Sequence, residues 1–191
     1  LALPQSELQQ IANCYLTATE IRFGYLQSVE AVALFVKTAI VECRNDNKAL
    51  NFFIKPAQFD IKFFDEKFCA ANDVARICHY DGKNWQEFNF ASSMGAKIIR
   101  VFSLDNVDQY DLKIFHALSV KMIGGSGDSS MLTAIFGSDI PFLQIRDWKR
   151  KFIADFINLI YHLHGECPLL HYFLCLSYAS RTELNIEGKM W

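Results

Sequence analysis

Residues 120–145 constrain the fold of this chain most, because they combine the signals of a strand, a glycine-rich turn, a short helix and a second strand. The segment reads VKMIGGSGDSSMLTAIFGSDIPFLQI. Its first residues, 120–123, are mostly apolar, and Val120 and Ile123 are β-branched, as expected for a buried parallel strand. Gly137 is expected to end the short helix. The segment therefore predicts one strand–helix–strand unit of an α/β fold.

The turn within this unit has the composition of a phosphate site. Gly124, Gly125 and Gly127 permit positive φ angles and a close approach of the backbone to a ligand. Asp128 and Ser129 are residue types that cap helices. Such a turn directs backbone N–H groups and the positive end of a helix dipole at the space above the strand. We therefore predict a phosphate or pyrophosphate ligand, the alternative being a tight turn that binds nothing.

Alternating strand and helix patterns continue through the rest of the chain. Strands are predicted for residues 20–27, 50–54, 75–80 and 96–104, and helices for residues 5–17, 28–43, 110–118 and 147–164. Residues 65–71 are left open between a short helix and a loop. This alternation predicts an α/β fold with a doubly wound, mainly parallel, Rossmann-like sheet. We expect a single domain in which residues 20–165 form the core and residues 166–191 a C-terminal helical extension.

Two turns far apart in sequence are expected to meet at one edge of this sheet. Ligands of such sheets bind at the carboxyl ends of the strands, where the turn at Gln27 and Ser28 and the turn at residues 124–128 both fall. The alternative for Ser28 is an ordinary helix cap. His79 and Asp81 follow another predicted strand, so a base or sugar contact is conceivable there, although packing at a strand end is the commoner role.

Composition excludes several classes of partner and location. The formal net charge is -2, which gives no electrostatic reason to expect nucleic acid. The longest apolar runs stop well short of the roughly 18 residues of a membrane-spanning helix. The opening residues, LALPQSELQQ, show no secretory signal and no initiator Met. We expect a cytoplasmic chain that is a piece of a longer protein.

Cysteine and histidine usage favours packing over metal binding. The chain has six cysteines, which we interpret as reduced, mostly buried thiols because no compact disulfide framework is present. Zinc-binding residue types gather near the C-terminus, at His162, His164, Cys167, His171 and Cys175. Their spacing fits no zinc pattern. We therefore predict neither a metal site nor a cofactor, a structural zinc at these residues being the alternative.

The glycine-rich turn does not match the sequence motifs of three common classes of enzyme. No Lys-Ser or Lys-Thr follows the last glycine, and the spacing G-G-x-G differs from G-x-G-x-x-G, so a P-loop ATPase and an NAD enzyme are disfavoured. The frame is not the G-x-S-x-G of a nucleophile elbow. A hydrolase that uses Ser126 or Ser129 stays open, provided that a histidine and an acid lie within hydrogen-bond reach.

The turn and its flanks resemble the donor-binding half of GT-B glycosyltransferases over about residues 20–165. That superfamily carries a turn of the form G-x-x-x-S-x-x-E-A-L-x-x-G-x-P-x at the phosphates of the nucleotide sugar. The residues that carry the resemblance, in a looser register than this form, are Gly125, Asp128, Ser129, Ser130, Ala134, Gly137 and Pro141. Thr133 departs from the pattern, because many members carry an acidic residue there.

The resemblance implies a nucleotide-sugar donor and transfer of the sugar to an acceptor, protein or glycan, that the sequence does not identify. The implied donor or phosphate contacts are Gly124, Gly125, Ser126, Gly127, Asp128, Ser129, Ser130 and, from the first loop, Tyr25, Gln27 and Ser28, with Arg146 in reach of a pyrophosphate. Catalytic residues are not assigned, since the base of inverting members lies largely on the other half. A non-catalytic, Rossmann-like interaction or regulatory nucleotide-binding module is the alternative, which Thr133 favours.

Overall fold

The computed structural model of the chain divides by its internal contacts into two compact units, residues 1–142 and 143–191. It describes residues 20–45, 49–56, 58–90, 97–105, 107–119, 121–145, 147–168, 170–171, 185–186 and 189–190. The predicted core ran to residue 165, whereas the first unit ends at Phe142. The predicted helix at residues 5–17 and most of the predicted extension lie outside the described residues.

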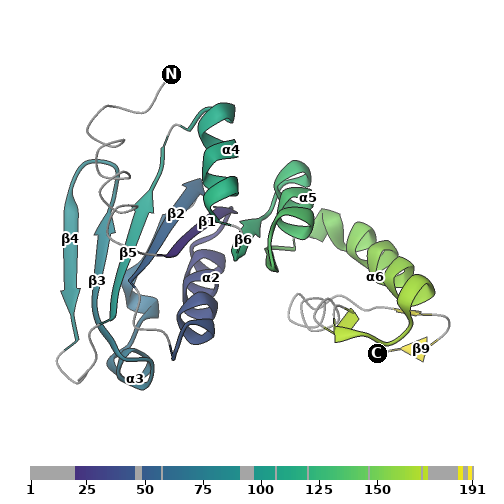
Figure 1. Ribbon diagram of the computed structural model, residues 1–191, viewed down its shortest axis with the longest axis horizontal. Coiled ribbons are helices and arrows are strands. Elements are labelled where there is room, and N and C mark those ends of the chain that lie inside the picture. The colour runs from purple at the N-terminus through teal and green to yellow at the C-terminus, as the bar shows by residue number, and fades with distance from the viewer. Residues whose placement is uncertain are drawn as a thin grey trace. The chain divides into compact units, whose positions relative to one another are not determined.

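The first unit is built on a seven-stranded, mostly parallel sheet in the order β4-β3-β5-β2-β1-β6-β7 (Figure 1). The strands are β1 (Glu20–Leu26), β2 (Leu50–Pro56), β3 (Val74–Tyr80), β4 (Trp85–Asn89), β5 (Lys97–Ser103), β6 (Met122–Gly125) and β7 (Ile140–Leu143). β1 pairs in parallel with β2 and with β6, and β4 runs antiparallel to β3. The predicted α/β, Rossmann-like class is confirmed.

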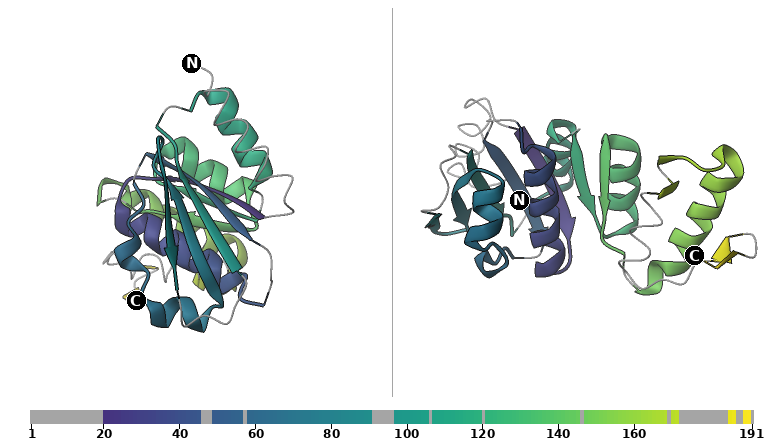
Figure 2. Two further views of the ribbon diagram at one scale, coloured as in Figure 1. Left: turned by 90° about the vertical axis from the view of Figure 1, so that its left-hand side faces the viewer. Right: turned by 90° about the horizontal axis from the view of Figure 1, so that it is seen from below.

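Helices cover both faces of this sheet, as a doubly wound fold requires (Figure 2). They are α2 (Val29–Glu42), α3 (Glu66–Ala71), α4 (Gln109–Leu118) and α5 (Asp128–Gly137), with a short 3-10 turn, η1 (Ile61–Phe63). Phe23 of β1 stacks on Phe115 of α4, with ring centroids 5.7 Å apart. Leu26 belongs to the core on the α2 side. Alternate residues of β1 thus serve opposite faces.

Three strands were not predicted: the edge strand of this sheet, and two short strands at residues 185–186 and 189–190, where a helical extension was expected. Trp85–Asn89 forms the edge strand β4, and its side chains are exposed or half-buried. Because this edge strand buries none of its side chains fully, it needs no regular alternation of apolar and polar residues, and its sequence WQEFN carries little pattern. β6 also begins later than predicted, at Met122, and takes in Gly124 and Gly125.

Two facing glycines allow the strands β1 and β6 to pack closely against the helix α2. Gly24 lies opposite Gly124 in the parallel register, and a Cβ added to Gly124 would be 3.1 Å from the Gly24 Cα. The same added Cβ would be 3.4 Å from the Phe35 ring of α2. The two glycines therefore make room for this buried aromatic ring over the centre of the sheet.

The second unit contains a 3-10 turn, η2 (Asp147–Lys149), the helix α6 (Arg150–His164) and a two-stranded ribbon of β8 (Asn185–Ile186) and β9 (Lys189–Met190). α6 buries Ile153, Ile157 and Ile160 on one side. It ends at Gly165, which has a φ of 64°. Among the described residues, no helix has both the length and the apolarity needed to cross a membrane.

Gly124→Ala is expected to destabilise the first unit by about 1–3 kcal/mol, because the new methyl group overpacks against Gly24 and Phe35. Gly137→Ala is the matched control: the nearest atoms to its added Cβ are 3.8 Å away, an ordinary contact distance. Urea unfolding of both variants measures the difference. Equal stabilities would show that the strands move apart at no cost.

Candidate functional site

The strand order places the carboxyl ends of β1 and β6 at a topological switch point. The chain leaves β1 through α2 toward β2 on one side, and β6 lies on the other side of β1. In open α/β sheets ligands bind in the crevice outside such strand ends. Tyr25 lies opposite Gly125 there, so the first strand and the glycine turn meet as predicted.

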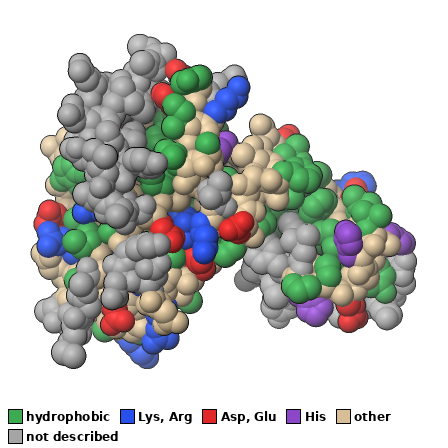
Figure 3. Space-filling model, in the orientation of Figure 1, with side chains coloured by type: hydrophobic (Ala, Val, Ile, Leu, Met, Phe, Trp, Pro, Cys, Tyr) green, Lys and Arg blue, Asp and Glu red, His purple; other side chains and the backbone are tan. Residues whose placement is uncertain are grey.

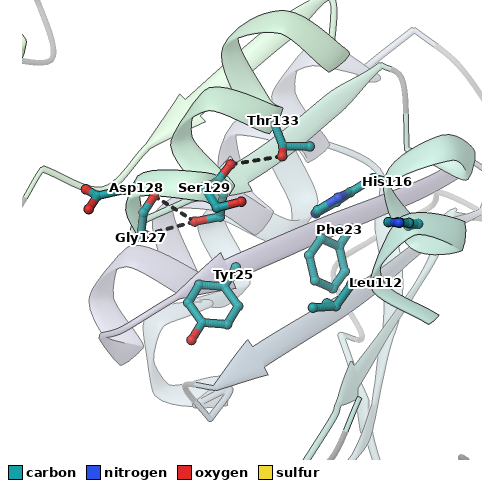
Figure 4. A pocket seen from close by; sticks show the side chains of 10 residues that line it. Phe23, Tyr25, Leu112, His116, Gly127, Asp128, Ser129 and Thr133 are labelled. Carbon is teal, nitrogen blue, oxygen red and sulfur yellow. Dashed lines mark hydrogen bonds between the residues drawn. The ribbon is translucent and has the colours of Figure 1, made fainter. Parts of the chain in front are cut away.

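A cavity of about 510 Å³ opens at this point (Figure 4). Its walls come from β1, α4 and the start of α5: Phe23, Tyr25, Leu112, Lys113, His116, Gly127, Asp128, Ser129, Ser130 and Thr133. Of the predicted binding residues, Tyr25 and residues 127–130 line it. The volume lies within the range of about 300–1,000 Å³ typical of small-molecule sites.

The Ser130 hydroxyl organises the turn from within. Its Oγ accepts hydrogen bonds from the backbone N–H of Ser126 at 3.2 Å and of Gly127 at 2.9 Å, and donates to the Gly127 carbonyl at 3.0 Å. The first helical hydrogen bond runs from Met131 N–H to the Gly127 carbonyl. The amides of Ser129 and Ser130 precede that bond, so they can donate to a ligand in the cavity.

The glycines of the turn serve close packing rather than unusual backbone angles. A Cβ on Gly125 would stand 2.5 Å from the Ser130 carbonyl oxygen, so Gly125 lets the first turn of α5 fold back over the strand end. The glycines with positive φ in the described ranges are Gly82 and Gly165. Gly124, Gly125 and Gly127 thus do not use the positive φ angles that glycine permits, and the close approach at Gly125 is made by the chain's own backbone.

The helix cap also differs from the expected one. Gly127 is the N-cap of α5, and no side chain of Asp128 or Ser129 caps it. The Asp128 side chain points away from Phe23 and His116 (Figure 4), and its charge in the first turn suits the helix dipole.

The other predicted contacts lie off this cavity. Ser28 caps α2, accepting a hydrogen bond from Ala31 N–H at 3.2 Å, which confirms its structural alternative. Gln27 is exposed and is not part of the cavity wall. Ser126 is 1% exposed and does not line the cavity. Arg146 lies outside the described residues.

Sequence reasoning missed the contribution of α4. His116 lines the cavity, and its ring meets the edge of Phe23 at a centroid distance of 5.0 Å. Its Nε2 atom is buried and has no hydrogen-bond partner among the described residues. Burial lowers the pKa of His116, so the imidazole is neutral near pH 7. The one available signal was the placement of Leu112 and His116 four residues apart on a single helix face.

The candidate zinc cluster does not form in the part of the chain that the structure describes. The histidine side chains of the second unit lie at separate points of its surface (Figure 3). Cys175 lies outside the described residues. Cys43, Cys69 and Cys78 are free and buried, as predicted for structural thiols.

One group of potential metal ligands is present among the described residues, formed by Glu20, Glu42 and Cys43. The buried Arg22 guanidinium already occupies it: Nη2 lies 2.6 Å from Glu20 Oε2 and 2.9 Å from Glu42 Oε2. Burial raises the pKa of the Cys43 thiol to about 12, so it is not a thiolate. We interpret this group as an ion-pair cluster at the amino end of β1.

Comparison of the chain with models of protein families, with curated proteins and with solved structures finds no match. The class of the protein therefore follows from its own fold. It is a Rossmann-like α/β protein with a cavity at the switch point of its sheet.

Ser130→Ala is expected to cost about 1–2 kcal/mol of stability, because the Ser126 and Gly127 amides lose their acceptor. Ser129→Ala is the matched control, because it removes a hydroxyl from the preceding residue and leaves the Ser130 hydroxyl in place. Urea unfolding reports both values. If the two variants were equally stable, the Ser130 hydroxyl would not hold the turn.

Stability is expected to fall as the pH drops below about 6.5. Burial lowers the pKa of His79 and of His116 from the ordinary 6.5, so below that value the unfolded chain binds more protons than the folded chain. His116→Leu should flatten this pH dependence, since it removes one of the two groups. Urea unfolding from pH 5 to 8 measures it, and an unchanged slope in the variant would contradict the assignment.

Proposed function

We propose that the cavity at the glycine turn binds the nucleoside diphosphate part of a nucleotide sugar, and that this chain is the donor-binding half of a GT-B-type glycosyltransferase. The observation that carries the proposal is the first turn of α5, which opens into a cavity of about 510 Å³ at the switch point of the sheet. Both the fold and the position of the cavity fit the general rule for nucleotide-binding α/β proteins.

The α5 side of the cavity suits a diphosphate. The amides of Ser129 and Ser130 and the positive end of a ten-residue helix face an anion placed there. Lys113 lines the same cavity and adds an ammonium group. A diphosphate that leaves during sugar transfer gains charge, and these groups stabilise that charge without a metal ion.

The α4 side suits a nucleoside. Phe23 and Leu112 supply apolar surface, and the Tyr25 ring lies beside the glycine turn (Figure 4). His116 adds one polar atom, the buried Nε2, which finds no partner among the described residues. A buried polar atom without a partner in a cavity wall is explained when a ligand or an ordered water completes it.

A specific observation favours the alternative, a Rossmann-like module that binds a nucleotide without catalysis. Thr133 stands where the resemblance expects an acid, and its hydroxyl donates to the Ser129 carbonyl at 2.9 Å. The one carboxylate among the lining residues belongs to Asp128, which points away from His116 (Figure 4). Sugar transfer from this chain together with its acceptor half would distinguish the two functions.

Calorimetric titration with UDP, GDP, dTDP and CDP tests the shared premise. At least one is expected to bind, and His116→Leu should weaken it about tenfold, the usual cost of one lost hydrogen bond. His164→Leu is the control, because that histidine is exposed on the second unit.

Circular dichroism of each protein establishes that it is folded during the titration. If none of the four compounds binds the folded chain at millimolar concentration, the donor-site proposal is rejected. Equal weakening by both histidine variants would remove His116 from the site.

A further inference from the structure

A second cavity of about 530 Å³ lies in the first unit, at the carboxyl ends of β2, β3 and β5. It is lined by Gln58, Phe59, Asp60, Ile61, His79, Asp81, Lys83, Gln86, Phe88, Ser103, Leu104 and Asp105. None of these residues lines the cavity at the glycine turn. The strand ends of a doubly wound sheet thus carry two separate cavities.

A serine and a histidine are hydrogen-bonded in its wall. His79 Nε2 lies 2.9 Å from Ser103 Oγ, and each residue is only 7% exposed. His79 comes two residues after Ile77 in β3 and Ser103 two residues after Val101 in β5, so both side chains lie on the α2 face of the sheet. The Phe59 ring packs on the imidazole at a centroid distance of 5.1 Å and fixes its orientation.

The electrostatics suit proton transfer from serine to histidine. Burial lowers the pKa of His79, so its imidazole is neutral near pH 7 and can accept a proton. The Asp81 carboxylate opposes this shift, and it also stabilises the imidazolium that proton transfer creates. Asp81 is itself held by the backbone amides of Asn84 and Lys83, at 2.8 and 2.9 Å.

We propose that Ser103 and His79 are the nucleophile and general base of a second activity, the hydrolysis of small carboxylic esters. Ser103 Oγ attacks the ester carbonyl carbon while its proton passes to His79 Nε2. The bond from that carbon to the alcohol oxygen then breaks, and the alcohol leaves with the proton from His79. Water, deprotonated by His79, attacks the acyl-serine, which releases the carboxylic acid and restores Ser103.

The remaining wall groups define the substrate class. Gln58 and Gln86 offer side-chain amide donors for the oxyanion that forms during attack. Asp60, Asp81 and Asp105 supply three carboxylates against the single ammonium of Lys83. Asp60 also pairs with Lys62 outside the wall, with Lys62 Nζ 2.7 Å from Asp60 Oδ2, so the excess negative charge of the wall comes from Asp81 and Asp105. Because like charges repel in a partly desolvated cavity, phosphate esters and other anions are disfavoured, and uncharged or cationic esters fit.

Ser103 takes the place of Ser126 and Ser129, which the sequence left open as nucleophiles of a hydrolase. No hydrogen bond joins Ser126 or Ser129 to a histidine in the described ranges, and the Ser126 hydroxyl is buried without a partner there. The hydrolase alternative therefore moves to Ser103, in another cavity. It does not depend on nucleotide binding.

The test is labelling of the full 191-residue chain with a fluorophosphonate probe, followed by peptide mass spectrometry. We expect one modified residue, Ser103, and slow hydrolysis of p-nitrophenyl acetate. Ser103→Ala should abolish the label, and His79→Gln should slow labelling at least 100-fold, the usual contribution of a general base. Ser119→Ala, a change at another buried serine, should label as the parent does.

The labelling rate of the parent should also rise with pH and level off near or below pH 6.5, as His79 loses its proton. A folded parent chain that gains no label at Ser103 overturns the proposal, whatever the variants do. A label on Ser103 whose rate ignores both pH and His79→Gln overturns the role of His79. Neither result affects the nucleotide titrations.

Discussion

The close contact between β1 and β6 is the constraint on which the candidate site depends. Because Gly24 and Gly124 face each other without side chains, the Phe35 ring of α2 lies over both strands on one face of the sheet. The other face is left to α4, whose Phe115 packs on Phe23. With β6 held against β1, the start of α5 lies beside Tyr25, and the cavity between α4 and α5 follows from this spacing.

The two cavities differ in chemistry because side chains from different strands and loops reach them, on opposite faces of the sheet. Phe23 and Tyr25 reach the first cavity on the α4 face, where a helix N-terminus supplies amide donors and positive potential. His79 and Ser103 reach the second on the α2 face, where loop carboxylates dominate. Under the two proposals, one cavity favours anions and the other disfavours them, so a single ligand that spans both is not expected.

Local patterns predicted most of the fold, whereas the sites needed the folded topology. The helix capped by Ser28 and the buried strand at β5 follow from spacing and capping, which are local signals. The edge strand β4 has no such pattern, because none of its side chains is fully buried. His116 reaches the glycine turn only after the chain has crossed back from β5 to β6, and His79 meets Ser103 only because β3 and β5 are neighbours. Residue spacing along the sequence could not predict that His116 would lie near the glycine turn or that His79 would contact Ser103.

The glycine turn shows how a correct residue choice can rest on a different physical reason. Its composition predicted a phosphate cradle in which glycine amides face the ligand. In the structure the Ser130 hydroxyl binds the Ser126 and Gly127 amides, and Gly125 makes room for the helix backbone. An anion bound as proposed would therefore meet the amides of Ser129 and Ser130 instead. The turn fixes the direction of α5, and under the proposed function the helix, rather than the glycines, supplies the electrostatic attraction.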